Sequence, residues 1–476
     1  MRLKGGQRVS DESRFTRRQF LKTTTATTAF AAAGISTVLW LGGCRRQLSG
    51  KRPNIIFILI DTLRADHVGC CGYRRSTTPN VDALAREGVL FNNAIVAAPW
   101  TLPSVASIMT SQYPCVLGIR DKMTVVNDKF PMFSQVLKKH GYTTCGIVSH
   151  TLLSSQLGFA RGFDRYDEKS SLGHSGISSP AVTSKAVSFV QQKHERPFFL
   201  FAHYFDPHFH YILHKQYDYY PSYNGIVRSG HPIGDIWRRR SDLTADDIKY
   251  LVALYDSEIS FTDEHIGMLL NEVKKRDLYD DSIIIITADH GEEFMERGWI
   301  GHTITLNQEL IRVPLIMKFP GCEPKVVDSA VGLIDIIPTL SSYLGFETDD
   351  NLEGEALNLS QADSIKSRPV FSETFNPQIH QPGFVKPVAF RSIVLGKHKL
   401  IYDEVKRMGR IYDLSSDPDE RSDLSSRLSG QDNRLKALLS QWTDYVSAKQ
   451  TTGPVYDERK LFTPEQRKQL ESLGYL

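Results

Sequence analysis

Pro53-Asn54-Ile55-Ile56-Phe57-Ile58-Leu59-Ile60-Asp61 is an uninterrupted apolar, mostly β-branched run that ends in an acid. Such a run is typical of a strand that is buried on both faces of a largely parallel sheet. A second run, from Ser282 to Ala288, is followed by Asp289-His290-Gly291. Open α/β sheets carry their chemistry at the carboxyl ends of the strands, so we expect both acids to lie at one site. The simpler alternative is that Asp61 only caps the next turn.

The rest of the chain completes an α/β pattern. We expect strands at 142–149 and 197–204 and helices at 78–88, 132–140, 244–276 and 335–344. This predicts a large, mostly parallel sheet sandwiched between helices. After the polar residues 346–368, short strands within 388–414 and a helix at 432–448 predict a small C-terminal antiparallel sheet with one helix.

The segment Pro99-Trp100-Thr101-Leu102-Pro103-Ser104-Val105-Ala106-Ser107-Ile108-Met109-Thr110 begins as a loop and continues as a helix. Pro103 suits the first position of a helix, which places Thr101 just before the helix N-terminus. The free N–H groups and the helix dipole favour an anion there, so a hydroxyl can be stabilised as an alkoxide beside a bound phosphate or sulfate. A threonine in this place is otherwise simply a cap.

Thr101-Leu102-Pro103-Ser104-Val105-Ala106-Ser107 resembles the C/S-x-P-S-R-A-S signature of sulfatases, with Thr101 in the nucleophile position. The resemblance covers nearly the whole chain after residue 52 and implies an alkaline phosphatase/sulfatase-like fold. Val105 replaces the signature arginine, and a threonine cannot be oxidised to the formylglycine aldehyde of sulfatases. Other branches of the alkaline phosphatase superfamily, such as the phosphoethanolamine transferases, use an unmodified threonine.

The resemblance also implies the site residues. Asp61, Thr101, Asp289 and His290 would hold one divalent metal ion, which is most often Ca²⁺ in the family. A histidine ligand favours Mn²⁺, Mg²⁺ or Zn²⁺. His302 would protonate the leaving oxygen, and His208 would hold another ester oxygen, although a structural role for either is the simpler alternative.

The N-terminal residues resemble an export signal. Thr16-Arg17-Arg18-Gln19-Phe20-Leu21-Lys22 is similar to a twin-arginine motif, and Leu41-Gly42-Gly43-Cys44 resembles a lipobox. We therefore expect residues 1–44 to be a lipoprotein signal, and the alternative is an uncleaved anchor helix. Either way, the protein would leave the bacterial cytoplasm and stay tethered to a membrane, in the periplasm or at the cell surface.

The charge of the chain bears on whether it binds nucleic acid. The chain has a formal net charge of +3, but residues 1–44 contribute seven basic and two acidic side chains, which leaves 50 basic and 52 acidic residues elsewhere. A nearly neutral mature protein gives no indication of nucleic-acid binding. We expect a small-molecule or glycan ester as the substrate.

Residues 209–243 carry many aromatic side chains and little periodicity. We interpret the segment as a lid whose rings stack on the substrate, or as a loop that its rings anchor to the body of the domain. The sequence predicts a catalytic domain at 52–345 and an α+β subdomain at 369–476. Three functions stay open: a metal-dependent hydrolase of sulfate or phosphate esters with a threonine nucleophile, a membrane-tethered phosphoryl-group transferase, and a non-catalytic binding protein.

Overall fold

The computed structural model describes residues 52–120, 124–172, 177–347, 351–359, 365–375, 388–427, 429–451 and 461–472. The predicted signal over residues 1–44, with Cys44, lies outside these ranges. Parts of the predicted subdomain at 369–476 lie outside them too. None of the helices in the described ranges combines the length and the apolar character that crossing a membrane requires.

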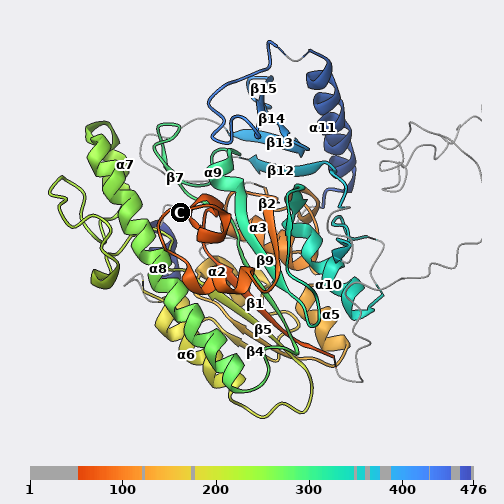
Figure 1. Cartoon of the computed structure of the whole chain (residues 1–476). Coiled ribbons are helices and arrows are strands. Elements are labelled where there is room, and N and C mark those ends of the chain that lie inside the picture. The colour runs from red at the N-terminus through yellow and green to blue at the C-terminus, as the bar shows by residue number, and fades with distance from the viewer. Residues whose placement is uncertain are drawn as a thin grey trace, which may run out of the picture. The chain divides into compact units, whose positions relative to one another are not determined.

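A nine-stranded sheet forms the centre of the described chain (Figure 1). Its order is β10-β2-β9-β6-β1-β5-β3-β4, with β11 beside β2. Strand β1 runs parallel to β5 and β6, whereas β9 runs antiparallel to β2 and β6. The mostly parallel sheet predicted from the sequence is therefore confirmed. The strands are β1 (Asn54–Ile60), β2 (Val89–Ile95), β3 (Thr143–Ile147), β4 (Arg165–Asp167), β5 (Phe198–Tyr204), β6 (Ser282–Ala288), β9 (Arg312–Lys318), β10 (Lys325–Val327) and β11 (Val331–Gly332).

Helices cover both faces of this sheet. Phe198 of β5 packs against Phe189 of α6, and the next residue, Phe199, packs against Phe133 of α5. Because successive strand residues point to opposite faces, α5 and α6 lie on opposite sides. Helix α8 packs on α6, and α3 packs on α5 and α10. The helices named here are α3 (Thr101–Thr110), α5 (Phe133–Lys139), α6 (Ser179–Val190), α8 (Ala245–Lys275) and α10 (Ile336–Leu344); the others are α2 (Pro79–Ala85), α4 (Pro114–Leu117), α7 (Ile233–Arg238), α9 (Gln308–Ile311), α11 (Ser429–Lys449) and α13 (Pro464–Ser472).

The strand register brings the two predicted acids together. Ile60 of β1 lies opposite both Tyr204 of β5 and Ala288 of β6. Asp61 follows Ile60 and Asp289 follows Ala288, so the two acids lie at the same level, just beyond the ends of neighbouring strands. The Asp61 backbone N–H donates to the Tyr204 carbonyl at 2.8 Å, which extends the pairing into this edge.

Helix α3 begins two residues earlier than the sequence predicted. Trp100 is its N-cap, because the Trp100 carbonyl accepts the first intrahelical bond, from Ser104 N–H at 3.2 Å. Thr101 is thus the first helical residue, and Pro103 is the third. The prediction was wrong because proline costs little anywhere in the first turn, where backbone N–H groups have no intrahelical partner.

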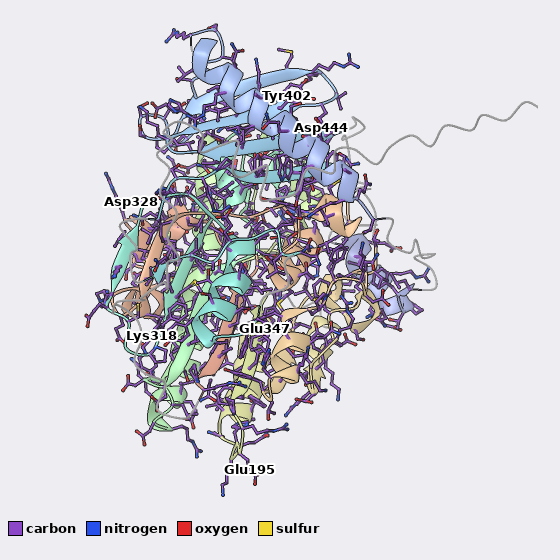
Figure 2. All side chains as sticks on the ribbon, turned by 90° about the vertical axis from the view of Figure 1, so that its right-hand side faces the viewer. Glu195, Lys318, Asp328, Glu347, Tyr402 and Asp444 are labelled. Carbon is purple, nitrogen blue, oxygen red and sulfur yellow. The ribbon has the colours of Figure 1, made fainter. Side chains whose placement is uncertain are left out.

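The C-terminal residues form the predicted small antiparallel sheet with one helix. Strands β12 (Val370–Phe375), β13 (Ala389–Leu395), β14 (His398–Asp403) and β15 (Met408–Asp413) pair in order. Helix α11 packs on β13 and β14, and its Trp442 stacks on Phe371 with ring centroids 4.6 Å apart. Figure 2 labels Tyr402 of β14 and Asp444 of α11 on this sheet and helix. Strand β12 was not predicted, because its polar residues weaken the apolar pattern.

Candidate functional site

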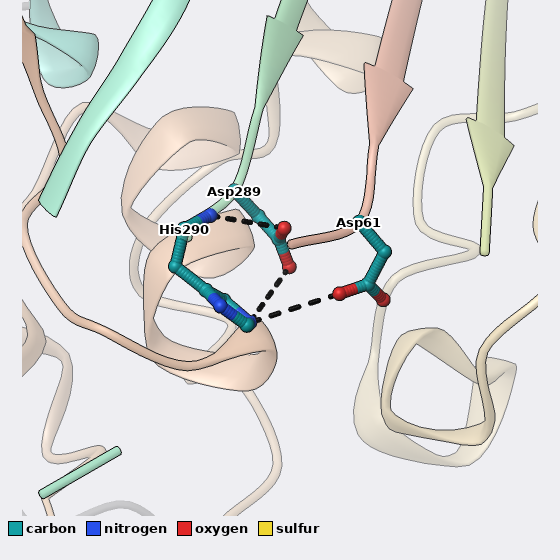
Figure 3. Close-up of side chains that lie close together, drawn as sticks. All are labelled: Asp61, Asp289 and His290. Atoms are coloured by element: carbon teal, nitrogen blue, oxygen red, sulfur yellow. Dashed lines mark hydrogen bonds and ion pairs between the residues drawn. The ribbon is translucent and has the colours of Figure 1, made fainter. Parts of the chain in front are cut away.

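Asp61, Asp289 and His290 lie together at the carboxyl ends of β1 and β6 (Figure 3). All three side chains are buried, and each offers a ligand atom within 4.8 Å of the other two. The His290 Nε2 atom is 3.7 Å from Asp61 Oδ1 and 3.5 Å from Asp289 Oδ2. Bonds of about 2.0–2.2 Å to a metal would place neighbouring donor atoms about 3–4 Å apart. The three side chains therefore have the spacing of a metal site.

Two buried carboxylates here have oxygens without a partner. Asp61 Oδ1 and Oδ2 and Asp289 Oδ2 accept no hydrogen bond from the described residues. Burial, and then the Asp289 charge, raises the pKa of Asp61 well above its usual range. Buried charges in proteins are paired or bound to metal. The unsatisfied oxygens fit a divalent cation.

The His290 ring is oriented toward the same point. Its Nδ1–H donates to the Gly291 carbonyl at 2.9 Å, so in the neutral ring Nε2 carries the lone pair. That lone pair faces the carboxylates of Asp61 and Asp289. The ring nitrogen and the two carboxylates face one another, and all of them offer lone pairs. Such a set of ligand atoms is typical of a cation site.

Thr101 is the buried first residue of α3, and its Oγ1 is 3.3 Å from His290 Nε2. The Ser104 hydroxyl donates to the Asp289 carbonyl at 2.6 Å, which ties the first turn of α3 to the end of β6. The structure thus brings Thr101 together with the three other residues that the sequence suggested as metal ligands. The positive end of the helix dipole also lies at this oxygen.

His302 and His208 are buried beside this cluster. The His302 Nδ1 atom is 2.9 Å from Glu292 Oε1, and the His302 ring centroid is 4.4 Å from that of His290. His208 donates from Nδ1 to the Phe209 carbonyl at 2.8 Å, and its ring is 5.0 Å from His302. Burial lowers the pKa of both rings well below the usual value. Both predicted histidines therefore face the region of the site.

Sequence reasoning missed His203, the last but one residue of β5. Its Nε2 atom is 3.4 Å from Asp61 Oδ2, and this nitrogen makes no hydrogen bond to any residue in the described ranges. Its Nδ1 is 3.3 Å from Ser149 Oγ, whose hydroxyl donates to the His203 carbonyl at 2.7 Å. The available signal was a histidine within the otherwise apolar strand 198–204, because a buried polar group needs a reason to be there.

The segment 209–243 is attached to the body of the protein through its aromatic residues. Trp237 donates from its indole N–H to the Ile300 carbonyl at 2.6 Å and stacks on Trp299. Four tyrosine hydroxyls bond to side chains of α8, in the pairs Tyr217–Glu264, Tyr219–Ser260, Tyr220–Asp246 and Tyr223–Asp247. These contacts support the anchoring alternative over stacking on a substrate.

The loop after His290 leads into a short hairpin of β7 (Glu293–Phe294) and β8 (Ile300–Gly301). Gly291 is required here, because a Cβ atom would lie 2.0 Å from the Glu309 carbonyl oxygen. Arg64 donates to the Glu292 carbonyl at 2.9 Å and pairs with Asp66 at 2.7 Å. The loop that carries His290 therefore packs closely against Glu309 at Gly291 and is bonded to Arg64 at Glu292.

Glu293 should make folding stability depend on pH. Burial, and then the nearby Glu309, raises the Glu293 pKa from 4.5 to about 8. The unfolded chain loses this proton near pH 4.5 and the folded chain only near pH 8, so stability falls as pH rises across that window. We expect Glu293→Gln to raise the free energy of unfolding at pH 8 by about 2–4 kcal/mol and to change it little at pH 4.5. Urea unfolding at both pH values measures this, and an equal effect at both would contradict it.

Comparison with known proteins adds the family. A sulfatase family model matches residues 53–346. The uncharacterized sulfatase YidJ of Escherichia coli is 25% identical over 434 residues, which cover 81% of this chain and 86% of that protein. The N-acetylglucosamine-6-O-sulfatase of Bacteroides thetaiotaomicron is 23% identical over 393 residues, which cover 64% and 70%.

Solved structures share the fold. The phosphonate monoester hydrolase of Agrobacterium radiobacter superposes with a TM-score of 0.69 at 19% identity, covering 85% of this chain and 100% of that chain. A protein in complex with its substrate D-glucosamine-2-N,6-O-disulfate gives a TM-score of 0.70 at 21% identity, covering 84% and 99%. With more than half of its length matched by the family model, the chain belongs to the sulfatase family of ester hydrolases, within the alkaline phosphatase superfamily.

Proposed function

We propose that this chain is a metal-dependent hydrolase of sulfate or phosphate esters in which unmodified Thr101 is the nucleophile. The observation that carries the proposal is the convergence of Thr101 with two unsatisfied buried carboxylates and a correctly oriented His290. Sulfatases generally use a divalent metal, and Asp61, Asp289, His290 and the Thr101 oxygen would hold one ion here. When bound, this cation would stabilise the Thr101 alkoxide and the negative charge on the ester oxygens.

The residues of the chain then have separate tasks. The Thr101 oxygen forms a bond to sulfur or phosphorus, its hydroxyl proton passes to His302, and the ester bond to the alcohol breaks. The electron pair stays on the alcohol oxygen, which takes a proton from His302. His208 holds another oxygen of the ester. Water then cleaves the covalent Thr101 ester and restores the hydroxyl.

Threonine affects the choice between sulfate and phosphate. A formylglycine diol releases sulfate by reverting to the aldehyde, whereas a threonine adduct has to be hydrolysed at sulfur or phosphorus. Hydrolysis of a phosphothreonine fits the chemistry of this superfamily, so we propose phosphate mono- and diesters as substrates alongside sulfate esters. The sulfated sugars of the relatives make a glycan or small-molecule ester the class to test first.

A panel of chromogenic sulfate, phosphate and phosphodiester substrates tests this function, with Ca²⁺, Mn²⁺, Mg²⁺ or Zn²⁺ added singly. Turnover that Thr101→Ala abolishes would support the hydrolase. Release of the chromophore only in the presence of an acceptor alcohol would favour the phosphoryl-group transferase. No turnover with any substrate and metal would favour the binding protein. The replacement of the signature arginine by Val105 is the argument for that alternative.

His203 is expected to support the metal site through Asp61. Removing its ring leaves Asp61 Oδ2 without its neighbour at 3.4 Å. Partners of metal ligands typically contribute 10–100-fold to metal affinity, and we expect a loss of about that size for His203→Leu. Titration of the metal-free protein, followed by calorimetry, measures the affinity, with His203→Gln retaining part of it. Wild-type affinity in His203→Leu would refute the role.

We also propose the cellular setting. The twin-arginine and lipobox motifs support export from the bacterial cytoplasm and a lipid on Cys44, with the catalytic domain at 52–345 and the subdomain at 369–476 held at the membrane. Cell fractionation and the mass of the N-terminal peptide test this. A soluble protein with an unmodified Cys44 would contradict it.

A further inference from the structure

Glu292 and His302 face each other because of the β7–β8 hairpin. Glu293 pairs with Gly301 in the antiparallel register. Glu292 precedes Glu293 and His302 follows Gly301, so these two residues lie opposite each other just beyond the last pair. Residues opposite each other on antiparallel strands have their side chains close together. The contact between Glu292 Oε1 and His302 Nδ1 at 2.9 Å is thus set by the backbone, and both side chains are buried.

Both oxygens of Glu292 are engaged. Oε1 meets His302, and Oε2 accepts a hydrogen bond from the Tyr211 hydroxyl at 2.9 Å. Arg64 fixes the backbone of the same residue by donating to its carbonyl. Tyr211 is itself buried and belongs to the segment 209–243. The carboxylate therefore has one orientation, and its hydrogen bonds extend from Tyr211 to the His302 ring.

We propose that Glu292, held by Tyr211, positions His302 for proton transfer to the leaving alcohol. This inference rests on the proposed function. A carboxylate that accepts from Nδ1–H fixes the tautomer and the ring orientation, as the aspartate does in a Ser-His-Asp triad. Nε2 is then the nitrogen that exchanges protons with the substrate. Nε2 takes up the proton that the Thr101 hydroxyl loses when its oxygen attacks. As the bond from sulfur or phosphorus to the alcohol oxygen breaks, its electron pair stays on that oxygen, which takes this proton from Nε2, and Nδ1–H stays bonded to Glu292.

The simpler alternative is that the pair only fastens the hairpin. The two readings differ in how the rate depends on the leaving group. A general acid matters most when the departing alcohol is a poor leaving group, and it matters little for a nitrophenol. A fastening role would affect all esters alike, because a distorted loop displaces His290 for every substrate.

The experiment compares variants of the metal-loaded enzyme on a series of aryl and alkyl esters. Glu292→Ala and His302→Gln are expected to lower kcat roughly 10²–10³-fold for the poorest leaving group and less than about 5-fold for the best, with KM nearly constant. Glu292→Gln, which can still accept from Nδ1–H, should recover about 10-fold of the loss. Tyr211→Phe should show the same pattern at about 10-fold. The Glu292→Ala/His302→Gln double variant should be no slower than His302→Gln alone.

Glu293→Gln is the matched control, because Glu293 is a buried neighbour in the same hairpin and its carboxylate accepts from the backbone N–H groups of Arg297 and Trp299 instead. It should stay within about 2-fold of wild type on every ester. A loss that is uniform across leaving groups, or a double variant whose losses multiply, would overturn the positioning role.

A second readout needs no turnover. In protein with ¹⁵N-labelled histidine, the ring signal that His302→Gln removes should be that of an Nδ1–H tautomer in wild type, and it should change in Glu292→Ala. An unchanged tautomer in Glu292→Ala would overturn the inference. Turnover that survives Thr101→Ala would instead contradict Thr101 as the nucleophile. The ring signal would still show whether Glu292 sets the tautomer of His302.

Discussion

Thr101→Ala is expected to reduce kcat by roughly 10⁴–10⁶-fold on whichever ester the wild-type protein hydrolyses, because the variant lacks the oxygen that attacks sulfur or phosphorus. Thr101 is fully buried with its Oγ1 beside His290, and alanine removes only the hydroxyl and one methyl group, so the fold should persist. Circular dichroism and thermal unfolding should match wild type. Steady-state kinetics on the metal-loaded protein measures the loss.

Thr101→Ser is the matched control. It keeps the hydroxyl and should retain activity within about 100-fold of wild type, provided that its mass shows an unmodified serine. Turnover by Thr101→Ala within 10-fold of wild type would mean that water attacks the ester directly, and the threonine would then serve only to bind the metal.

Asp289→Asn is expected to abolish the response to metal while leaving the metal-free protein as stable as wild type, or more so. Without metal, the Asp61 and Asp289 carboxylates repel each other in a buried place, and the substitution removes one charge. Saturating Mn²⁺, Ca²⁺ or Zn²⁺ should raise the wild-type Tm by about 5–15 °C. Asp289→Asn should show about 2 °C or less and lose roughly 10³-fold in kcat. Scanning calorimetry with chelator and with each metal measures both effects.

Asp206→Asn is a suitable control for that experiment. Asp206 is also a buried carboxylate beyond the end of a strand, β5, but it accepts backbone N–H groups from Ser178 and Ser179. Its loss should lower Tm with and without metal and leave the metal-induced rise intact. A full metal response in Asp289→Asn would show that the ion binds elsewhere.

The meeting of Asp61 with Asp289 could be predicted because parallel strands in register end at one edge. Each acid follows a strand whose apolar residues indicate burial on both faces. The start of α3 at Thr101 was less predictable, because proline is tolerated throughout the first turn and so marks the helix end only approximately. The family resemblance placed Thr101 correctly beside the acids even so.

Other parts of the site depend on tertiary contacts that no local pattern reports. His203 lies beside Asp61 because β5 pairs with β1. The other residues of this strand are apolar or aromatic on both faces, so the sequence pattern does not indicate in which direction the histidine side chain points. The contact of Glu292 with His302 depends on the register of a hairpin of two-residue strands, which is too short for a pattern. Tyr211 reaches Glu292 from a segment without periodicity. Such contacts become visible only when the chain is folded.

The most direct test of the account is to quench the metal-loaded enzyme in acid during turnover and to locate covalent adducts by peptide mass spectrometry. We predict one sulfo or phospho group on Thr101, absent after metal removal and absent in Thr101→Ala. An adduct on another side chain, or steady turnover with an unmodified Thr101 even when a slowly hydrolysed ester is used, would contradict the assignment of Thr101 as the nucleophile.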